Sequence, residues 1–279
     1  KRKLALFCNV KQEAVIESID AETIYDVPLL MLDEGLDQVV LNMLKLESRA
    51  SDLDQWKEFL RKHKNPKEQI TIGLIGKYVE LQDSYKSILE SLIHSGAANE
   101  VKVKVESIHS EFLNAENVSE KLKNLDGVIV APGFGGRGIE GKIEAVRHAR
   151  ENNIPFLGIC LGMQCAVIEF ARNVLNLGDA HSTEMSEKTN APVISMMEEQ
   201  KKISNMGGTM RLGAYQCELK PKSNAGLAYN TNKISERHRH RYEFNNDYLA
   251  SYEGAGMTAT GKNPDTGLVE IVEIPNHPW

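Results

Sequence analysis

The stretch Ile154-Pro-Phe-Leu-Gly-Ile-Cys-Leu-Gly-Met-Gln164 decides which fold this sequence indicates. An apolar run ends in Gly158-Ile-Cys-Leu-Gly162, and helix-forming residues follow from Met163 to Ala171. The pattern is G-x-S-x-G with cysteine in place of serine, which is typical of a nucleophile elbow, a sharp turn from a strand into a helix. Such a turn strains the backbone of the nucleophile and needs glycine where the chain doubles back. The sequence therefore predicts that Cys160 is a nucleophile at the start of a helix.

Two backbone features of such an elbow would favour chemistry at Cys160. The dipole of the following helix favours the thiolate, which is the reactive form of the sulfur. The backbone N–H of Leu161 points at whatever the sulfur attacks and supplies one donor of an oxyanion hole. The alternative is that Cys160 is a small buried residue packed between two glycines, as many cysteines are.

The composition is that of an ordinary globular protein. The chain has 279 residues, of which 41% are hydrophobic and 26% are charged. A formal net charge of −6 argues against general nucleic-acid binding. No apolar run approaches the roughly 20 residues that a membrane-spanning helix needs, and the basic, briefly apolar N-terminus is too short for a signal peptide. The four cysteines (8, 160, 165 and 217) include no C-x-x-C pair, so we expect free thiols and a cytoplasmic location.

The order of elements predicts an α/β fold. From residue 70 onward, strands alternate with helices, which is typical of an open, mainly parallel sheet with helices on both faces. The expected strands are residues 70–75, 101–108, 126–131 and 154–159. The expected helices are residues 84–97, 118–125, 139–152 and 162–171. A loop-rich stretch, 178–205, then precedes three more strands at 207–216, 234–244 and 268–274.

The first 69 residues look like parts of a larger arrangement. Residues 1–46 are too few for a core of their own, and we expect a strand at 4–10 followed by helices at 13–19 and 27–46. Residues 47–69 are expected to be a linker that carries one amphipathic helix at 51–63, with Ser51 and Asp54 in a capping-box pattern.

The loop Gly133-Phe-Gly-Gly-Arg-Gly138 has two interpretations. It matches the G-x-G-x-x-G fingerprint of dinucleotide-binding folds, but that motif wants an acidic residue at the tip of the next strand, where this sequence has Cys160. Alternatively, its bare backbone N–H groups face the elbow from the neighbouring strand end, and Gly133 supplies a second oxyanion donor.

The segment Glu236-Arg-His-Arg-His-Arg-Tyr-Glu243 is the third unusual feature. On a strand, arginines 237, 239 and 241 would share one face, and His238, His240 and Tyr242 the other. Two histidines at i, i+2 could hold a metal, although no third ligand follows at ligand spacing. Otherwise the segment is a solvated charged face, or one arginine grips a substrate carboxylate.

Together these motifs resemble the CTP synthase family. The residues that carry the resemblance are Gly158–Gln164, Ala131-Pro-Gly-Phe-Gly135, Ser182-Thr-Glu184, Gly207-Gly-Thr-Met-Arg-Leu-Gly213 and Glu236–Tyr242. The first two alone indicate a class I glutamine amidotransferase, with its flavodoxin-like sheet, and the last two are specific to CTP synthase. The resemblance covers residues 70–279 as the amidotransferase domain, 1–46 as the end of the synthetase domain and 47–69 as the linker between them.

The resemblance implies that glutamine is hydrolysed to glutamate and ammonia through a cysteine thioester. Ammonia would pass through a tunnel to the synthetase domain, where ATP-activated UTP becomes CTP. It also implies that L-glutamine and the synthetase domain are partners, that ATP and Mg belong to that domain, that GTP is an allosteric activator and that the intact enzyme is a homotetramer. No cofactor, metal, nucleic acid or membrane is expected at the present residues.

The resemblance assigns site residues position by position. Cys160 resembles the nucleophile, Gly133 and Leu161 the oxyanion pair, and Gln164, Glu184 and Arg241 the residues that hold glutamine. Glu184 suits the substrate ammonium and Arg241 the substrate carboxylate, and charge-assisted bonds at both ends discriminate free glutamine from peptide-bound side chains.

Two departures from the family pattern affect these expectations. Ala131-Pro132-Gly133 stands where many members have Pro-Gly-Gly, but the donor at Gly133 is retained. The family's catalytic His-x-Glu lies a few residues beyond Trp279. We therefore expect that this chain is a fragment truncated at both ends and that it does not turn over glutamine on its own. The other hypotheses are a non-catalytic glutamine-binding or docking module, a different α/β cysteine hydrolase, and a dinucleotide-binding protein.

Overall fold

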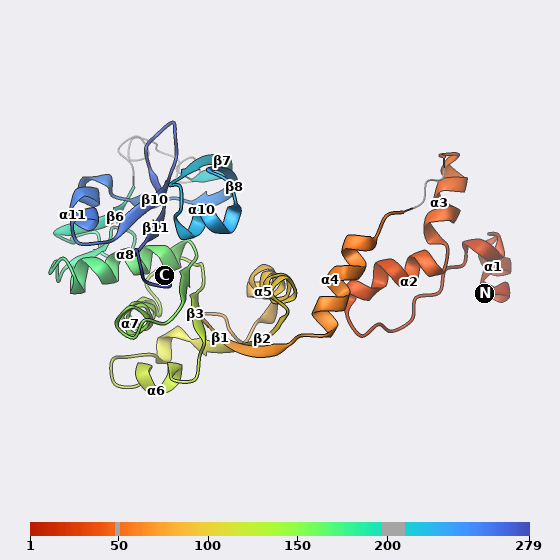
Figure 1. Cartoon of the computed structure of the whole chain (residues 1–279), viewed down its shortest axis with the longest axis horizontal. Helices are drawn as coiled ribbons and strands as arrows, with labels where there is room; N and C mark the ends of the chain where they lie inside the picture. The colour runs from red at the N-terminus through yellow and green to blue at the C-terminus, as the bar shows by residue number, and fades with distance from the viewer. Residues whose placement is uncertain (48–50, 197–209) are drawn as a thin grey trace. The chain divides into compact units, whose positions relative to one another are not determined.

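The computed structural model describes residues 1–47, 51–196 and 210–279. Within these, the chain forms two compact units (Figure 1). One unit consists of Lys1–Gln69 with Ser91–Lys102, and the other consists of Ile70–Glu90 with Val103–Trp279.

The N-terminal unit is helical. Its helices are α1 (Arg2–Cys8), α2 (Val27–Asp33), α3 (Leu36–Leu44) and α4 (Asp54–Lys64), with 3-10 turns at Gln12–Ala14 and Ile24–Asp26. The strand predicted at 4–10 is wrong: α1 occupies this stretch, and a helix satisfies its backbone donors locally, without a partner strand. The helix predicted at 13–19 is reduced to a 3-10 turn, and the one predicted at 27–46 is divided by Gly35, whose φ is 74°.

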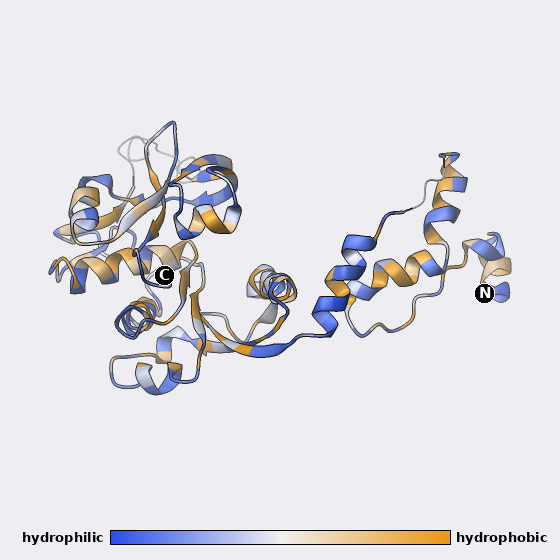
Figure 2. Ribbon diagram, in the orientation of Figure 1, coloured by the Kyte–Doolittle hydropathy of each residue, from blue (hydrophilic) through white to orange (hydrophobic). Residues whose placement is uncertain are grey.

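Helix α4 lies where an amphipathic helix was predicted, but the predicted capping box is wrong. Leu53 occupies the N-cap position, and the Asp52 carboxylate accepts the Asp54 N–H at 3.1 Å. Figure 2 shows that α4 is largely hydrophilic. Its aromatic residues pack against Tyr25, whose carbonyl accepts the indole N–H of Trp56 at 2.9 Å.

The second unit contains the predicted parallel sheet. Its strands are β1 (Glu68–Gly76), β2 (Val101–His109), β3 (Gly127–Val130) and β4 (Phe156–Gly158), in the order β2-β1-β3-β4. The helices that alternate with these strands are α5 (Lys86–Asn99), α6 (Val118–Leu122), α7 (Ile139–Glu151) and α8 (Leu161–Asn173), with 3-10 turns at Gln82–Tyr85 and Ser110–Phe112. The part of α5 from Ser91 onward belongs to the first unit. β3 pairs in parallel with both β1 and β4, so Ile75, Val130 and Gly158 end at one edge of the sheet. The α/β class and the parallel sheet are confirmed.

Two further sheets complete this unit. One has the order β5-β6-β9, with β5 (Ala180–Ser182), β6 (Ala191–Ser195) and β9 (Glu243–Phe244). The other is antiparallel in the order β11-β10-β7-β8, with β7 (Arg211–Leu219), β8 (Lys233–His240), β10 (Thr258–Lys262) and β11 (Val269–Glu273). The short helices are α10 (Asn224–Tyr229), α11 (Leu249–Gly254) and a 3-10 turn at Asn246–Tyr248.

Several predictions in this region need correction. Strands β5 and β6 fall in the stretch predicted as loop, β10 was not predicted, and the strand predicted at 234–244 is broken at residues 241–242. The predictions for residues 197–205 and 207–209 lie outside the described residues.

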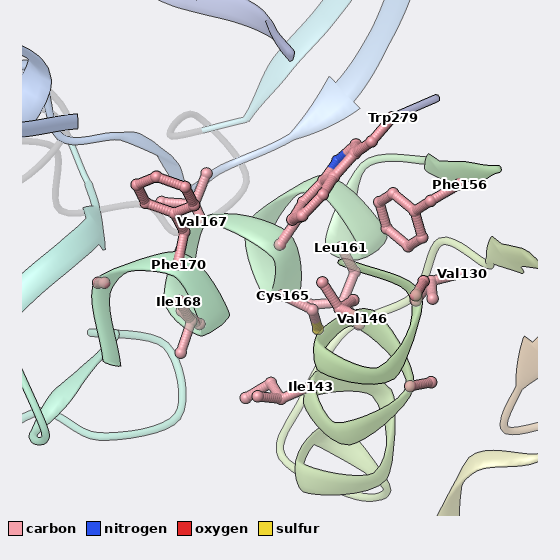
Figure 3. Close-up of a cluster of buried hydrophobic side chains, with 14 of the residues drawn as sticks. Val130, Ile143, Val146, Phe156, Leu161, Cys165, Val167, Ile168, Phe170 and Trp279 are labelled. Carbon is pink, nitrogen blue, oxygen red and sulfur yellow. The ribbon is translucent and has the colours of Figure 1, made fainter. Parts of the chain in front are cut away.

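The core of the second unit fixes α8. Helices α7 and α8 pack side by side, and Figure 3 shows Cys165 of α8 directed at α7 near Val146. Leu161 and Cys165 are fully buried, and the ring of Trp279 stands edge-on to Phe156 at 4.9 Å. The first residue after Cys160 is therefore anchored in the core. Among the described helices, none is long and apolar enough to cross a membrane.

Candidate active site

Cys160 occupies a nucleophile elbow between β4 and α8. It is the N-cap residue of α8, with φ 53° and ψ −104°, a conformation that L-residues rarely adopt. A Cβ placed on Gly158 would lie 2.6 Å from the carbonyl carbon of Gly162, and one on Gly162 would lie 2.1 Å from the Val130 oxygen. The chain doubles back so tightly that both flanking positions need glycine, as predicted.

The electrostatics at Cys160 are a balance of opposing effects. Burial raises the pKa of the thiol, and this outweighs the hydrogen bond from the Leu161 N–H, which lowers it. Glu184 and Glu243 raise the pKa further, whereas Lys142 lowers it. The helix N-terminus thus acts in the predicted direction, but it does not by itself keep the sulfur ionised.

The glycine loop after β3 lies beside the elbow. A Cβ on Gly133 would be 3.4 Å from the Leu161 side chain. The N–H of Gly135 donates to Oε1 of Glu184 at 2.9 Å. A carboxylate therefore sits on the backbone donor that a dinucleotide phosphate would need and would repel such an anion, which disfavours the dinucleotide interpretation.

Gln164 and Glu184 both approach Tyr242, which follows β8. The side-chain amide of Gln164 donates to the Tyr242 carbonyl at 3.2 Å, and its Oε1 is buried with no partner in the described structure. Burial and Glu184 raise the pKa of the Tyr242 phenol, and Arg241 lowers it. Both charges that were expected to hold glutamine thus act on the same phenol.

The predicted strand faces hold only as far as His240. Arg237 and Arg239 are exposed, and His238 and His240 are half-buried, in the alternation that a strand gives. Arg241 is half-buried in the bend between β8 and β9, so it does not share the face of the other two arginines. Because the strand ends at His240, that part of the prediction is wrong.

A cavity of about 1080 Å³ opens at the elbow. Cys160, Gln164 and Tyr242 line it, and so do His238 and His240. The cavity is much larger than a single amino acid needs. Its lining does not include Glu184 or Arg241, so the structure brings the predicted residues to one region without arranging all of them around one cavity.

Comparisons with known proteins identify the family. Residues 80–279 match the family described as "Glutamine amidotransferase class-I", and residues 1–46 match "CTP synthase N-terminus". The chain belongs to the class I glutamine amidotransferase family.

The relatives of this amidotransferase are named CTP synthase. This chain is 65% identical over 280 residues to the CTP synthase of Flavobacterium psychrophilum. It is 53% identical over 279 residues to the CTP synthase of Clostridium acetobutylicum. Each match covers 100% of the chain and 52% of the relative, so the chain spans about half their length. The glutaminase domain of Trypanosoma brucei CTPS with bound acivicin matches at a TM-score of 0.69 and 36% identity, covering 74% of this chain and 81% of that one.

An ion-pair network that the sequence did not reveal lies on the cavity wall of the amidotransferase. Arg211 of β7 bonds to Glu243 at 3.2 Å and to Glu270 of β11 at 2.9 Å. His238 approaches Glu270 at 3.4 Å, and His240 approaches Glu243 at 3.3 Å. The sequence feature that could have indicated this network is the presence of charged residues, Arg211 and Glu270, at inward-facing positions of β7 and β11.

The same network contains a group that could hold a metal. His238, His240 and Glu270 offer three ligand atoms within 4.8 Å of one another, so β11 supplies the third ligand that the sequence spacing lacked. However, the Arg211 guanidinium already bonds to both carboxylates and compensates their charge. Burial lowers the pKa of His240 to about 4 and raises that of Glu243 to about 7. We interpret the group as a buried ion-pair network and propose no metal there.

Two other histidines, His109 and His277, have structural roles. His109 Nδ1 accepts the Glu111 N–H at 3.3 Å and caps the 3-10 turn at Ser110–Phe112. His277 Nε2 lies 3.0 Å from the Arg150 carbonyl. Neither belongs to the cavity lining.

Proposed function

We propose that this chain is the glutaminase part of a CTP synthase. It hydrolyses L-glutamine at Cys160, and the whole enzyme uses the ammonia to convert UTP into CTP with ATP. The observation that carries this proposal is the elbow, where a strained cysteine lies between two obligatory glycines and accepts the N–H of Leu161. Similarity to curated CTP synthases over the whole chain supports it.

The proposed reaction uses the elbow directly. The Cys160 thiolate attacks the carboxamide carbon, and the N–H groups of Leu161 and Gly133 stabilise the oxyanion. The C–N bond breaks, ammonia leaves with a proton from the base, and a thioester remains. Water then attacks the thioester, and glutamate and the free thiol are released.

Selection of a free amino acid would fall to charged groups near Tyr242. Glu184 would bind the substrate ammonium, and Arg241 would bind its carboxylate through a bidentate contact. Gln164, whose amide bonds to the Tyr242 carbonyl, would fix the substrate side chain. A site with a charge at each end rejects peptide-bound glutamine, which lacks both charges.

Neither histidine on the cavity wall is suited to act as the general base of this reaction. His238 and His240 line the cavity but face Glu270 and Glu243, and the pKa of His240, lowered to about 4, makes it a weak base.

The wider roles follow from the family. ATP and Mg would act in the synthetase part, GTP would activate the glutaminase, and the intact enzyme would be a cytoplasmic homotetramer. None of these is assigned to a described residue.

Labelling by a glutamine-derived electrophile tests the proposal. Cys8 is exposed, whereas Cys165 is fully buried and Cys217 is 2% exposed, so a general alkylating agent should find Cys8 first. A glutamine-derived electrophile should instead label Cys160, and free glutamine should compete. The control is the same experiment on Cys8→Ser. Labelling spread over Cys8 and Cys160, or insensitive to glutamine, would overturn the proposal.

A further inference from the structure

Lys142 is a buried cation that the proposed reaction does not yet use. It lies in the first turn of α7, where the neighbouring inward positions are the apolar Ile139 and Ile143, and its side chain is fully buried. Its ammonium donates to the Ala131 carbonyl at 2.7 Å. Burial of a charge is unfavourable unless the charge is paired and hydrogen-bonded, so a buried ammonium at this position suggests a specific role.

The ammonium lies where the glycine loop meets the elbow. The carbonyl that it binds belongs to the residue after β3, two positions before Gly133. A Cβ on Gly133 would be only 3.9 Å from Lys142 Nζ and 3.4 Å from the Leu161 side chain. The ammonium therefore adjoins the segment that presents Gly133, and Gly133 in turn lies against the Leu161 side chain.

We propose that Lys142 is a positioning residue for the reaction at Cys160. Its ammonium holds the Ala131 carbonyl, which orients the turn that presents Gly133, and its charge favours the negative charge that develops on the sulfur and the oxyanion. The inference deepens the proposed glutaminase function and rests on it.

The electrostatic relationship between the two groups is reciprocal. Burial lowers the pKa of Lys142 to about 8, and the thiolates of Cys165 and Cys160 would raise it, whereas Lys77 lowers it. Below pH 8 the ammonium is charged and lowers the pKa of Cys160, in opposition to Glu184 and Glu243. The benefit to Cys160 is therefore present near neutral pH and is lost as the pH rises above about 8.

Alkylation of Cys160 by iodoacetamide tests this without any glutamine. The variant is Lys142→Met, which removes the charge and keeps an unbranched side chain that is one atom shorter. The control is Lys86→Met on the exposed surface of α5. The alkylation rate of the Cys160 peptide is followed by mass spectrometry against pH. We expect Lys142→Met to slow alkylation of Cys160 about tenfold near neutral pH, and the difference from wild type to shrink above about pH 8, where the ammonium is lost. A profile that matches the control, in a variant with a cooperative thermal melt, would overturn the inference.

A second measurement keeps the inference testable if Lys142→Met does not fold. In the wild-type chain with 13C-labelled lysine, Cys160 is converted either to its neutral iodoacetamide adduct or to its anionic iodoacetate adduct. One lysine should titrate near pH 8, and its midpoint should be higher beside the anionic adduct. Equal midpoints, or lysines that all titrate in the ordinary range, would contradict the proposal. Loss of glutamine-selective labelling with these shifts intact would instead count against the glutaminase function alone.

Discussion

The N–H of Gly135 donates to the Glu184 carboxylate at 2.9 Å, so a charge that follows β5 is held against the loop that follows β3. The same carboxylate raises the pKa of Cys160. Glu184 therefore acts on the nucleophile and, in the proposed function, on the substrate ammonium as well.

Replacement of this acid should have opposite effects on two reagents. In Glu184→Gln the thiol pKa falls, because the carboxylate that raises it is gone, and iodoacetamide should alkylate Cys160 several-fold faster at neutral pH. The glutamine-derived electrophile should react more slowly, because its ammonium loses its partner. The exposed Glu187→Gln is the control for both measurements. Parallel changes with the two reagents would mean that Glu184 does not contact the substrate.

Arg241 and Arg239 are a matched pair on one segment. Arg241 is half-buried in the bend after β8, and Arg239 is exposed on the strand. Loss of a charge-assisted contact to the substrate carboxylate should weaken binding by about 2–5 kcal/mol. We expect Arg241→Met to raise the KM for glutamine in the full-length enzyme at least tenfold, with little change for Arg239→Met. Similar KM values in the two variants would remove Arg241 from the proposed site.

The Arg211 network should matter for stability. Arg211 is 7% exposed, so Arg211→Met leaves Glu243 and Glu270 without their cation and should lower the free energy of unfolding by about 3–5 kcal/mol. Lys233→Met removes an exposed pair with Glu218 on the same sheet and should cost about 0–1 kcal/mol. Urea unfolding of both variants measures the difference, and equal values would show that the network contributes no more than a surface pair.

The loss in free energy of unfolding caused by Arg211→Met should also depend on pH. Burial raises the pKa of Glu243 to about 7, which is above its unfolded value, so this carboxyl is increasingly ionised, and increasingly in need of Arg211, as the pH rises through 7. The stability difference between wild type and variant should therefore be larger at pH 8 than at pH 6. A difference that is independent of pH would mean that Glu243 is already ionised at pH 6.

The elbow glycine should tolerate no side chain. A Cβ on Gly162 would lie 2.1 Å from the Val130 backbone oxygen, and α8 cannot shift because Leu161 is buried in the core. We expect Gly162→Ala to lower the melting temperature by several degrees and to abolish selective labelling of Cys160. Gly178→Ala, where a Cβ would meet nothing within 4 Å, is the control. Unchanged labelling in Gly162→Ala would mean that the elbow can relax without loss of the nucleophile's geometry.

Local sequence predicted the elements that carry strong, local patterns. The run before Cys160 and the alternation at β2 became strands, because their apolar positions match the sheet that buries them. At residues 4–10 an apolar run became a helix, since the choice there depends on whether a partner strand exists and not on the run itself.

The site was predictable to a similar extent. Cys160, Leu161 and Gly133 are adjacent because strand ends in a parallel sheet meet at one edge, which sequence order alone implies. Arg241 was placed on a strand that ends one residue earlier, and the network of Arg211 with Glu243 and Glu270 depends on pairing between strands far apart in sequence. Lys142 in a mostly apolar helix face gave no recognisable motif.

The backbone of Cys160 implies a trade between reactivity and robustness. With φ at 53° and ψ at −104°, a residue that carries a side chain lowers the stability of the folded state by about 1–3 kcal/mol through backbone strain, which glycine would not cause. Cys160→Gly should therefore be the more thermally resistant protein, although it lacks a nucleophile. Selection for stability alone would replace this cysteine by glycine, so its presence at this turn indicates selection for the reactivity of its thiol.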